Sequence, residues 1–143
     1  MTPPCDALHR RRRGERGSAL FLFPVGLIIV MLLGAIVVDF ANAHLARRDL
    51  ADAASAAAND AVTYGLDLDS VHRDGTYALD PARVRAAVDA SLDRRGTTPE
   101  LTSVNVSIDG TVVEVRLDRQ VGLPFSGSMT VSATGRADAL TSR

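Results

Sequence analysis

The sequence predicts an α+β protein: a long N-terminal transmembrane helix that continues outside the membrane, then a small domain of one helix on an antiparallel sheet. Three stretches of the 143-residue chain lead to this prediction. Residues 17–38 carry no charge, residues 40–62 are rich in alanine, and residues 102–117 alternate apolar and polar side chains about an Asp-Gly pair. The expected organisation is an arginine-rich cytoplasmic leader at 1–16, a transmembrane helix at 17–40, an alanine-rich extracytoplasmic helix at 41–64, a loop at 65–80 and a small α+β extracytoplasmic domain at 81–143.

The uncharged stretch is long enough to cross a bilayer. It spans 22 residues, from 17 to 38, between Arg16 and Asp39. As a helix it would be about 33 Å long, against a hydrocarbon core of about 30 Å. A helix that is apolar on all sides needs either lipid or a large protein core around it, and this chain is too short to build such a core. We therefore expect a membrane span.

The arginines on either side of this stretch predict its orientation. Five arginines precede it, at 10–13 and 16, whereas Arg47 and Arg48 follow it among several aspartates. An excess of arginine marks the cytoplasmic side of a span. The N-terminus is therefore expected in the cytoplasm and the chain after Val38 outside, in a protein of the cell membrane.

The alanine-rich stretch predicts a helix with one narrow face of small residues. Residues 40–62 contain ten alanines and neither Gly nor Pro, and Gly65 is a natural C-cap. Small side chains at spacings of three and four suit close packing, either against other helices of an assembly or against the protein's own domain. The candidate helix-packing surface consists of Ala43, Ala46, Leu50, Ala54, Ala57 and Ala61.

The remainder predicts one helix and a small sheet. Residues 65–80 are polar and are expected to form a loop, whose aspartates lack the spacing of a calcium-binding loop. Asp80-Pro81 begins a helix that continues to residue 95. Asp109-Gly110 predicts a two-residue hairpin turn in which Ile108 pairs with Thr111. A third strand is expected at 129–135, after a loop at 121–128, and the helix should cover the Val/Ile face of the sheet.

No motif for catalysis or for cofactor binding is present in the sequence. His9, His44 and His72 have no partners at the spacing of a metal site or a catalytic triad. Ser126 lacks the flanking pattern of a nucleophile elbow. A net charge of −1 gives no reason to expect nucleic acid as a partner. We therefore expect that the protein is not an enzyme and that it binds no metal and no cofactor.

The segment from the basic leader to the alanine-rich helix, about residues 13–62, resembles the N-terminal region of TadE/TadG-like proteins, the pseudopilins and assembly proteins of bacterial Flp-type tight-adherence pili. The features that carry the resemblance are Gly17 after the basic leader, Ala19-Leu20, Pro24, Asp39, Arg47-Arg48, Leu50 and the alanine-rich run 51–58. The resemblance implies a pilin-like layout and a candidate processing site at Gly17 and Ser18. Members that prepilin peptidase processes carry Glu at the fifth position after the cleavage glycine, and here that position is Leu22.

The expected function is that of a non-enzymatic, single-pass membrane component, similar to a minor pilin or pseudopilin, in a Flp/Tad-type pilus or secretion assembly. Its expected partners are the membrane and other pilin-like or Tad assembly proteins, with no small-molecule substrate. The alternative is a secreted soluble binding module. Residues 41–43 have the A-x-A form of a signal-peptidase site after a basic and apolar run, so cleavage after Ala43 would release it.

Overall fold

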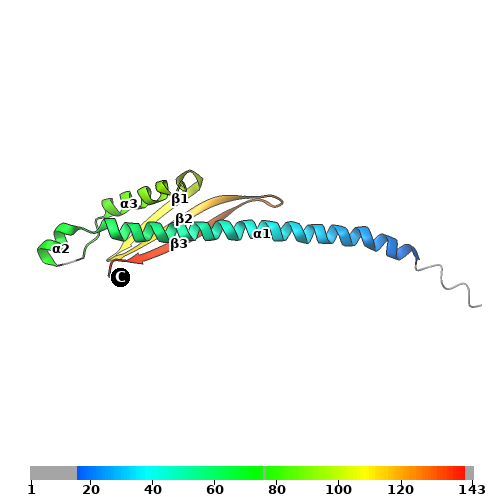
Figure 1. Cartoon of the computed structure of the whole chain (residues 1–143), viewed down its shortest axis with the longest axis horizontal. Helices are drawn as coiled ribbons and strands as arrows, with labels where there is room; N and C mark the ends of the chain where they lie inside the picture. The colour runs from blue at the N-terminus through cyan, green and yellow to red at the C-terminus, as the bar shows by residue number, and fades with distance from the viewer. Residues whose placement is uncertain (1–15, 76, 141–143) are drawn as a thin grey trace, which may run out of the picture. The chain divides into compact units, whose positions relative to one another are not determined.

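The structure, a computed structural model, describes residues 16–75 and 77–140. The elements within these ranges are α1 (Arg16–Gly65), α2 (Leu68–Asp74), α3 (Pro81–Arg94), the 3-10 helix η1 (Thr98–Glu100), β1 (Leu101–Asp109), β2 (Val112–Leu123) and β3 (Gly127–Asp138) (Figure 1). This order confirms the predicted α+β fold of a long helix followed by a helix and an antiparallel sheet. The predicted leader lies, apart from Arg16, outside the described residues.

The chain divides into two compact units, residues 1–38 and residues 39–143. In the first unit, the described residues belong to α1. The second unit contains the rest of α1, which we call the domain part of α1 (39–65), together with all the other elements. The helix α1 ends with Gly65, where the sequence predicts the C-cap.

The sheet is a meander of three antiparallel strands in the order β1-β2-β3. The predicted hairpin register is wrong by two residues, because Ile108 pairs with Val113 and not with Thr111. Asp109 remains in the strand, so the two-residue turn consists of Gly110 and Thr111. A positive φ of 61° at Gly110 is suited to the first position of such a turn. A shift of two residues preserves the faces of the strands, so the predicted core face is correct.

Contacts with β3 hold Thr111 in the turn. Its hydroxyl donates a hydrogen bond to Asp138 at 2.9 Å, and its carbonyl accepts one from the amide of Ala139 at 3.0 Å. The second hairpin also differs from the prediction, because β2 and β3 extend through most of the expected loop at 121–128. Only residues 124–126 form the turn between these strands.

The core lies between one face of the sheet and two helices, the domain part of α1 and α3 (Figure 1). The sheet contributes mainly aliphatic side chains that alternate along β2, at Val113, Val115 and Leu117. The predicted stripe of α3 is buried, at Val84, Ala87, Val88, Ser91 and Leu92. The helix α1 contributes Leu50, Ala53, Ala54, Ala57, Ala58, Ala61 and Val62.

The helix α1 and the sheet approach each other backbone to backbone at Gly135. A Cβ atom at this position would overlap the carbonyl group of Ala54 and the amide nitrogen of Ser55. Gly135 pairs with Val115 in the middle of the sheet, and Ala54 is fully buried. Any side chain larger than hydrogen at residue 135 would therefore push α1 away from the sheet.

The predicted loop at 65–80 contains a short helix, α2, that the sequence analysis missed. Asp67 caps its N-terminus by accepting hydrogen bonds from the amide of Asp69 and the hydroxyl of Ser70. Gly75 ends it in the left-handed conformation, with φ 64°. Seven residues are too few for a periodic apolar pattern, so only these two caps could have indicated the helix.

Gly135→Ala should destabilise the domain by about 1–3 kcal/mol or more, because the added methyl group meets backbone atoms that cannot move aside independently. Gly122→Ala is the matched control, because Gly122 also lies in a strand and a Cβ there would meet open space. Chemical denaturation of both variants in detergent measures the difference. Equal free energies of unfolding for the two variants would show that the close approach is not a constraint.

Candidate functional site

His9 lies outside the described residues, and His44, His72 and Ser126, which the sequence shows without catalytic partners, can be placed in the structure. Among the described residues, no group of three His, Cys, Asp or Glu side chains could hold a metal ion. His44 stacks on Phe40 with ring centroids 6.4 Å apart, and Nδ1 of His72 lies 2.6 Å from the carbonyl oxygen of Leu68. Ser126 hydrogen-bonds to the carboxylate of Asp39. The contacts of His44 and His72 join residues one helical turn apart, and the contact of Ser126 joins the β2–β3 turn to α1.

The most distinctive surface of the first unit is the apolar segment, residues 22–38. Apart from two glycines its side chains are all apolar, and all its large side chains are exposed. Within the described part of the chain, α1 is the one helix long and apolar enough to cross a membrane, and an 18-residue stretch of it has a mean hydropathy of 2.6. Exposed side chains of this kind are stable in lipid and unstable in water. The candidate functional site is therefore a helix that could cross a membrane.

The second unit begins with a buried acid. Asp39 is only 5% exposed and accepts hydrogen bonds from the hydroxyl of Ser126 and from the amide of Phe125, the latter at 3.2 Å. Both donors lie in the turn between β2 and β3, more than 80 residues further along the chain. Because a buried carboxylate needs hydrogen-bond donors, the turn and α1 stabilise each other at this point.

The candidate helix-packing surface of α1 is covered by the protein's own domain. Ala46, Leu50, Ala54, Ala57 and Ala61 are buried, and Ala43 is half-buried. The sheet and α3 occupy the face that these residues form. Of the two partners that the sequence allowed, the structure shows the protein's own domain on this face.

The candidate processing residues, Gly17 and Ser18, lie in the first turns of α1. Leu22, which stands at the fifth position where processed pilins carry Glu, has an exposed apolar side chain. It adds to the apolar segment and supplies no carboxylate to pair with an amine.

The sheet face opposite the core is polar. It carries Ser103, Asn105, Ser107, Glu114, Arg116, Asp118, Gln120, Ser132, Thr134 and Arg136, which project from neighbouring strands. The hydroxyl of Ser103 donates to Asp118 at 2.6 Å. This bond, the nearby hydroxyl of Ser132 and the nearby Arg116 hold the pKa of Asp118 below its ordinary value of 3.8. The face is a hydrogen-bonded surface suited to water or to a polar protein partner.

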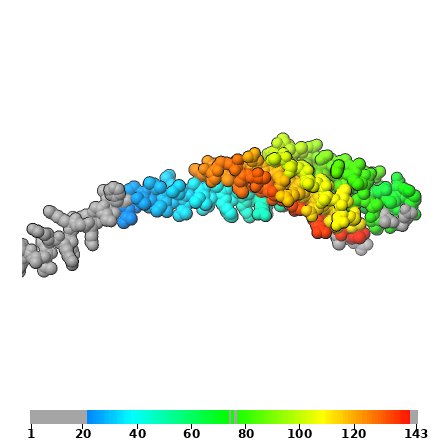
Figure 2. Space-filling view, turned by 180° about the vertical axis from the view of Figure 1, so that it is seen from behind, coloured from blue at the N-terminus to red at the C-terminus, as the bar shows by residue number. Residues whose placement is uncertain are grey.

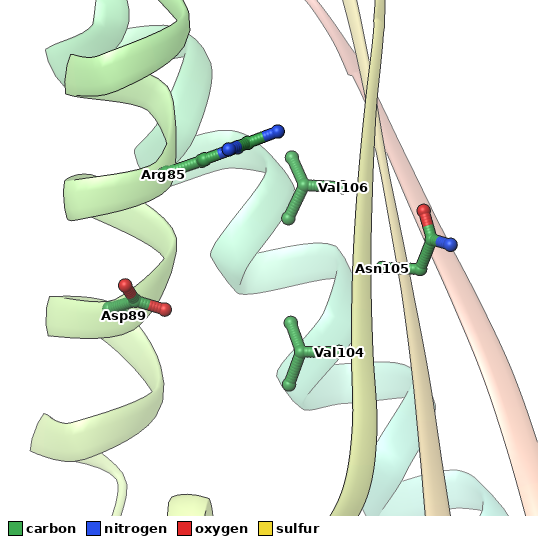
Figure 3. Close-up of a pocket in the computed structure, with 5 residues that line it drawn as sticks. All are labelled: Arg85, Asp89, Val104, Asn105 and Val106. Carbon is green, nitrogen blue, oxygen red and sulfur yellow. The ribbon is translucent and has the colours of Figure 1, made fainter.

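A shallow groove of about 340 Å³ separates α3 from the free edge of the sheet. Arg85 and Asp89 reach into it from α3, and Val104 and Val106 face them from β1, whereas Asn105 points to the opposite side of the strand (Figure 3). The groove offers one cation, one anion and two valines, without a buried polar group that would fix the orientation of a ligand.

Residues 17–63 match the family model described as putative Flp pilus-assembly TadE/G-like. This match confirms the resemblance found in the sequence, over the segment that contains the apolar segment and nearly all of the domain part of α1. No curated protein and no solved structure matches the chain.

Asp39→Ala should destabilise the domain by about 1–3 kcal/mol, because the amide of Phe125 and the hydroxyl of Ser126 lose their acceptor. Asp52→Ala is the matched control: Asp52 is exposed at another interior position of α1, and its removal should change the stability by less than about 0.5 kcal/mol. Denaturation monitored by circular dichroism compares the two variants. If they lost the same stability, the contact between Asp39 and the turn would contribute nothing.

Ser103→Ala should raise the pKa of Asp118 towards 3.8, because it removes the largest cause of the lowering. A carboxyl whose folded-state pKa is depressed stabilises the protein above its unfolded-state pKa, and that contribution is lost as the pH falls through the folded-state value. The variant should therefore be less stable than the parent at neutral pH and should approach it in acid. NMR titration of the Asp118 carboxyl measures the shift. Ser107→Ala, on the same face, should leave this pKa unchanged, and an equal shift in both variants would contradict the assignment.

Proposed function

We propose that the protein is a non-enzymatic, single-pass membrane component of a Flp/Tad-type pilus or secretion assembly, similar to a minor pilin or pseudopilin. The observation that carries the proposal is the match of residues 17–63 to a pilus-assembly family. The matched segment contains the apolar segment, whose exposed side chains require lipid, and the alanines that fill the core of the domain.

In this proposal one helix performs two tasks. The apolar segment anchors the protein in the bilayer, with the N-terminus in the cytoplasm as the arginines at 10–13 and 16 indicate. The domain part of α1 supplies the surface on which α3 and the sheet fold. The folded domain then lies outside the cytoplasm and presents the polar face of its sheet to other assembly proteins.

The structure gives less support to release as a secreted module. Ala43 lies in the interior of α1, so the chain at the expected cleavage site is regular helix. Cleavage after Ala43 would also remove Asp39, which holds the turn between β2 and β3. We therefore propose that the chain retains its anchor.

A reporter that is active only outside the cytoplasm, fused after Arg143, tests the orientation. We expect it to be active, and we expect neutral residues in place of the arginines at 10–13 to reduce its activity, because the charge difference across the span becomes smaller. The same substitutions at Arg47 and Arg48 are the control and should not reduce it. An unchanged orientation after loss of the leader arginines would contradict the argument.

The mass of the mature chain in membranes tests whether the anchor is retained. We expect either the intact chain or a chain that begins at Ser18, because both keep residues 22–38. A chain that begins at His44 would refute the anchored function and establish secretion. Extraction of the membranes with alkaline carbonate is the companion measurement, and an anchored chain should remain in the membrane pellet.

A further inference from the structure

The tip of the β2–β3 hairpin, residues 121–129, is an apolar surface that the fold leaves exposed. Phe125 is 66% exposed and Met129 is 42% exposed, and Pro124 is exposed beside them. Hydrogen bonds from Phe125 and Ser126 to Asp39 hold this tip, orange in Figure 2, at the start of the domain part of α1. A single exposed apolar side chain is ordinary, whereas several that lie together on one surface mark a contact with a membrane or a partner.

The hairpin tip also belongs to a long stretch without charge. No charged residue occurs between Arg119 and Arg136, a run of 16 residues from 120 to 135. The adjacent part of α1, residues 40–46, is likewise without Asp, Glu, Lys or Arg, and it exposes Phe40 and Leu45. This end of the domain therefore combines the aromatic rings of Phe40 and Phe125 with the aliphatic side chain of Leu45 and the thioether of Met129, on neighbouring elements.

Asp39 fixes the hairpin tip at the residue that follows the apolar segment. The amide of Phe125 and the hydroxyl of Ser126 both donate to its carboxylate, and Asp39 directly follows Val38 in the chain. These two bonds also satisfy the carboxylate of Asp39, which is the one acidic side chain between residues 17 and 46. A carboxylate with its hydrogen bonds made inside the protein is easier to hold near lipid than one that depends on water.

We propose that the hairpin tip, with Phe40 and Leu45, inserts into the interfacial layer of the same bilayer that the apolar segment crosses, on the non-cytoplasmic side. This inference rests on the proposed function, because it takes residues 22–38 to be the span. The occupant of the surface is lipid: the headgroup region and the upper acyl chains contact Phe125, Pro124 and Met129. The domain then has two attachments to the membrane, the helix and the hairpin.

The charges on α1 agree with this depth. The first arginines after the span are Arg47 and Arg48, which lie about 12 Å along the helix from Asp39. The headgroup layer on one side of a bilayer is roughly 5–8 Å thick. The backbone of Arg47 and Arg48 would thus lie just outside the headgroup layer, with their long side chains able to reach back to it, and the uncharged surface would lie at the depth of the headgroups.

Tryptophan fluorescence can test the inference directly, because the chain contains no Trp. Phe125→Trp, Val30→Trp and Tyr77→Trp each introduce a single Trp into the full chain, reconstituted in phosphatidylcholine vesicles. Val30 lies in the apolar segment, and Tyr77 is exposed beyond the far end of the domain part of α1. Vesicles with lipids brominated near the headgroup end of the acyl chains should quench the Trp at 125 by about half and leave the Trp at 77 unquenched.

The three variants distinguish the possible failures. Quenching at 30 but not at 125 would overturn the hairpin insertion and leave the proposed anchor intact, whereas no quenching at either position would refute both. A third outcome is that the emission of the Trp at 125 is shifted to the blue, is not quenched by brominated lipid and changes with the ratio of protein to lipid. This result would show that a second copy covers the tip and that the proposal is wrong. Met129→Trp is a second probe of the tip and should be quenched like Phe125→Trp, provided that circular dichroism shows the folded domain.

Discussion

The fold depends on the close approach of α1 to the sheet at Gly135. A hydrogen at this position lets the backbone of Ala54 lie directly on the middle of the sheet. The neighbouring positions of α1 are alanines for the same reason, since larger side chains would hold the helix away from Val115 and Leu117. A chain without Trp, with an aliphatic core, obtains close packing from small residues and short distances.

This contact makes the domain part of α1 a member of the core and not a stalk. Seven of its side chains belong to the core cluster, and α3 packs beside it on the same sheet face. The end of the sheet at the turn between β2 and β3 is fixed by Asp39, which accepts hydrogen bonds from that turn. The domain therefore begins at Asp39, the residue that directly follows the apolar segment.

Much of this arrangement could be predicted from local patterns. The uncharged stretch, the alanine-rich helix, the stripe of α3 and the core face of the sheet all follow from periodicity within a single element. The hairpin register could not be predicted, because contacts of Thr111 with β3 decide which residues form the turn. The short helix α2 was missed because its seven residues contain no full apolar period.

The long-range contacts were beyond the reach of the sequence. Nothing local distinguishes Gly135 from a glycine that merely ends a strand, and its partner Ala54 lies 81 residues earlier in the chain. The same is true of Asp39 and Ser126, which the sequence presented as a boundary residue and a loop serine. The alanine stripe suited both an assembly and an intramolecular core, and only the position of the sheet distinguishes them.

The central claim is that the domain part of α1 is required for the domain to fold. Two fragments test it in water, residues 39–143 and residues 66–143, which differ only in this helix. We predict that 39–143 unfolds cooperatively on heating and that 66–143, whose Val113, Val115 and Leu117 lose their cover, shows no cooperative transition. A cooperative transition of equal stability in 66–143 would contradict the account.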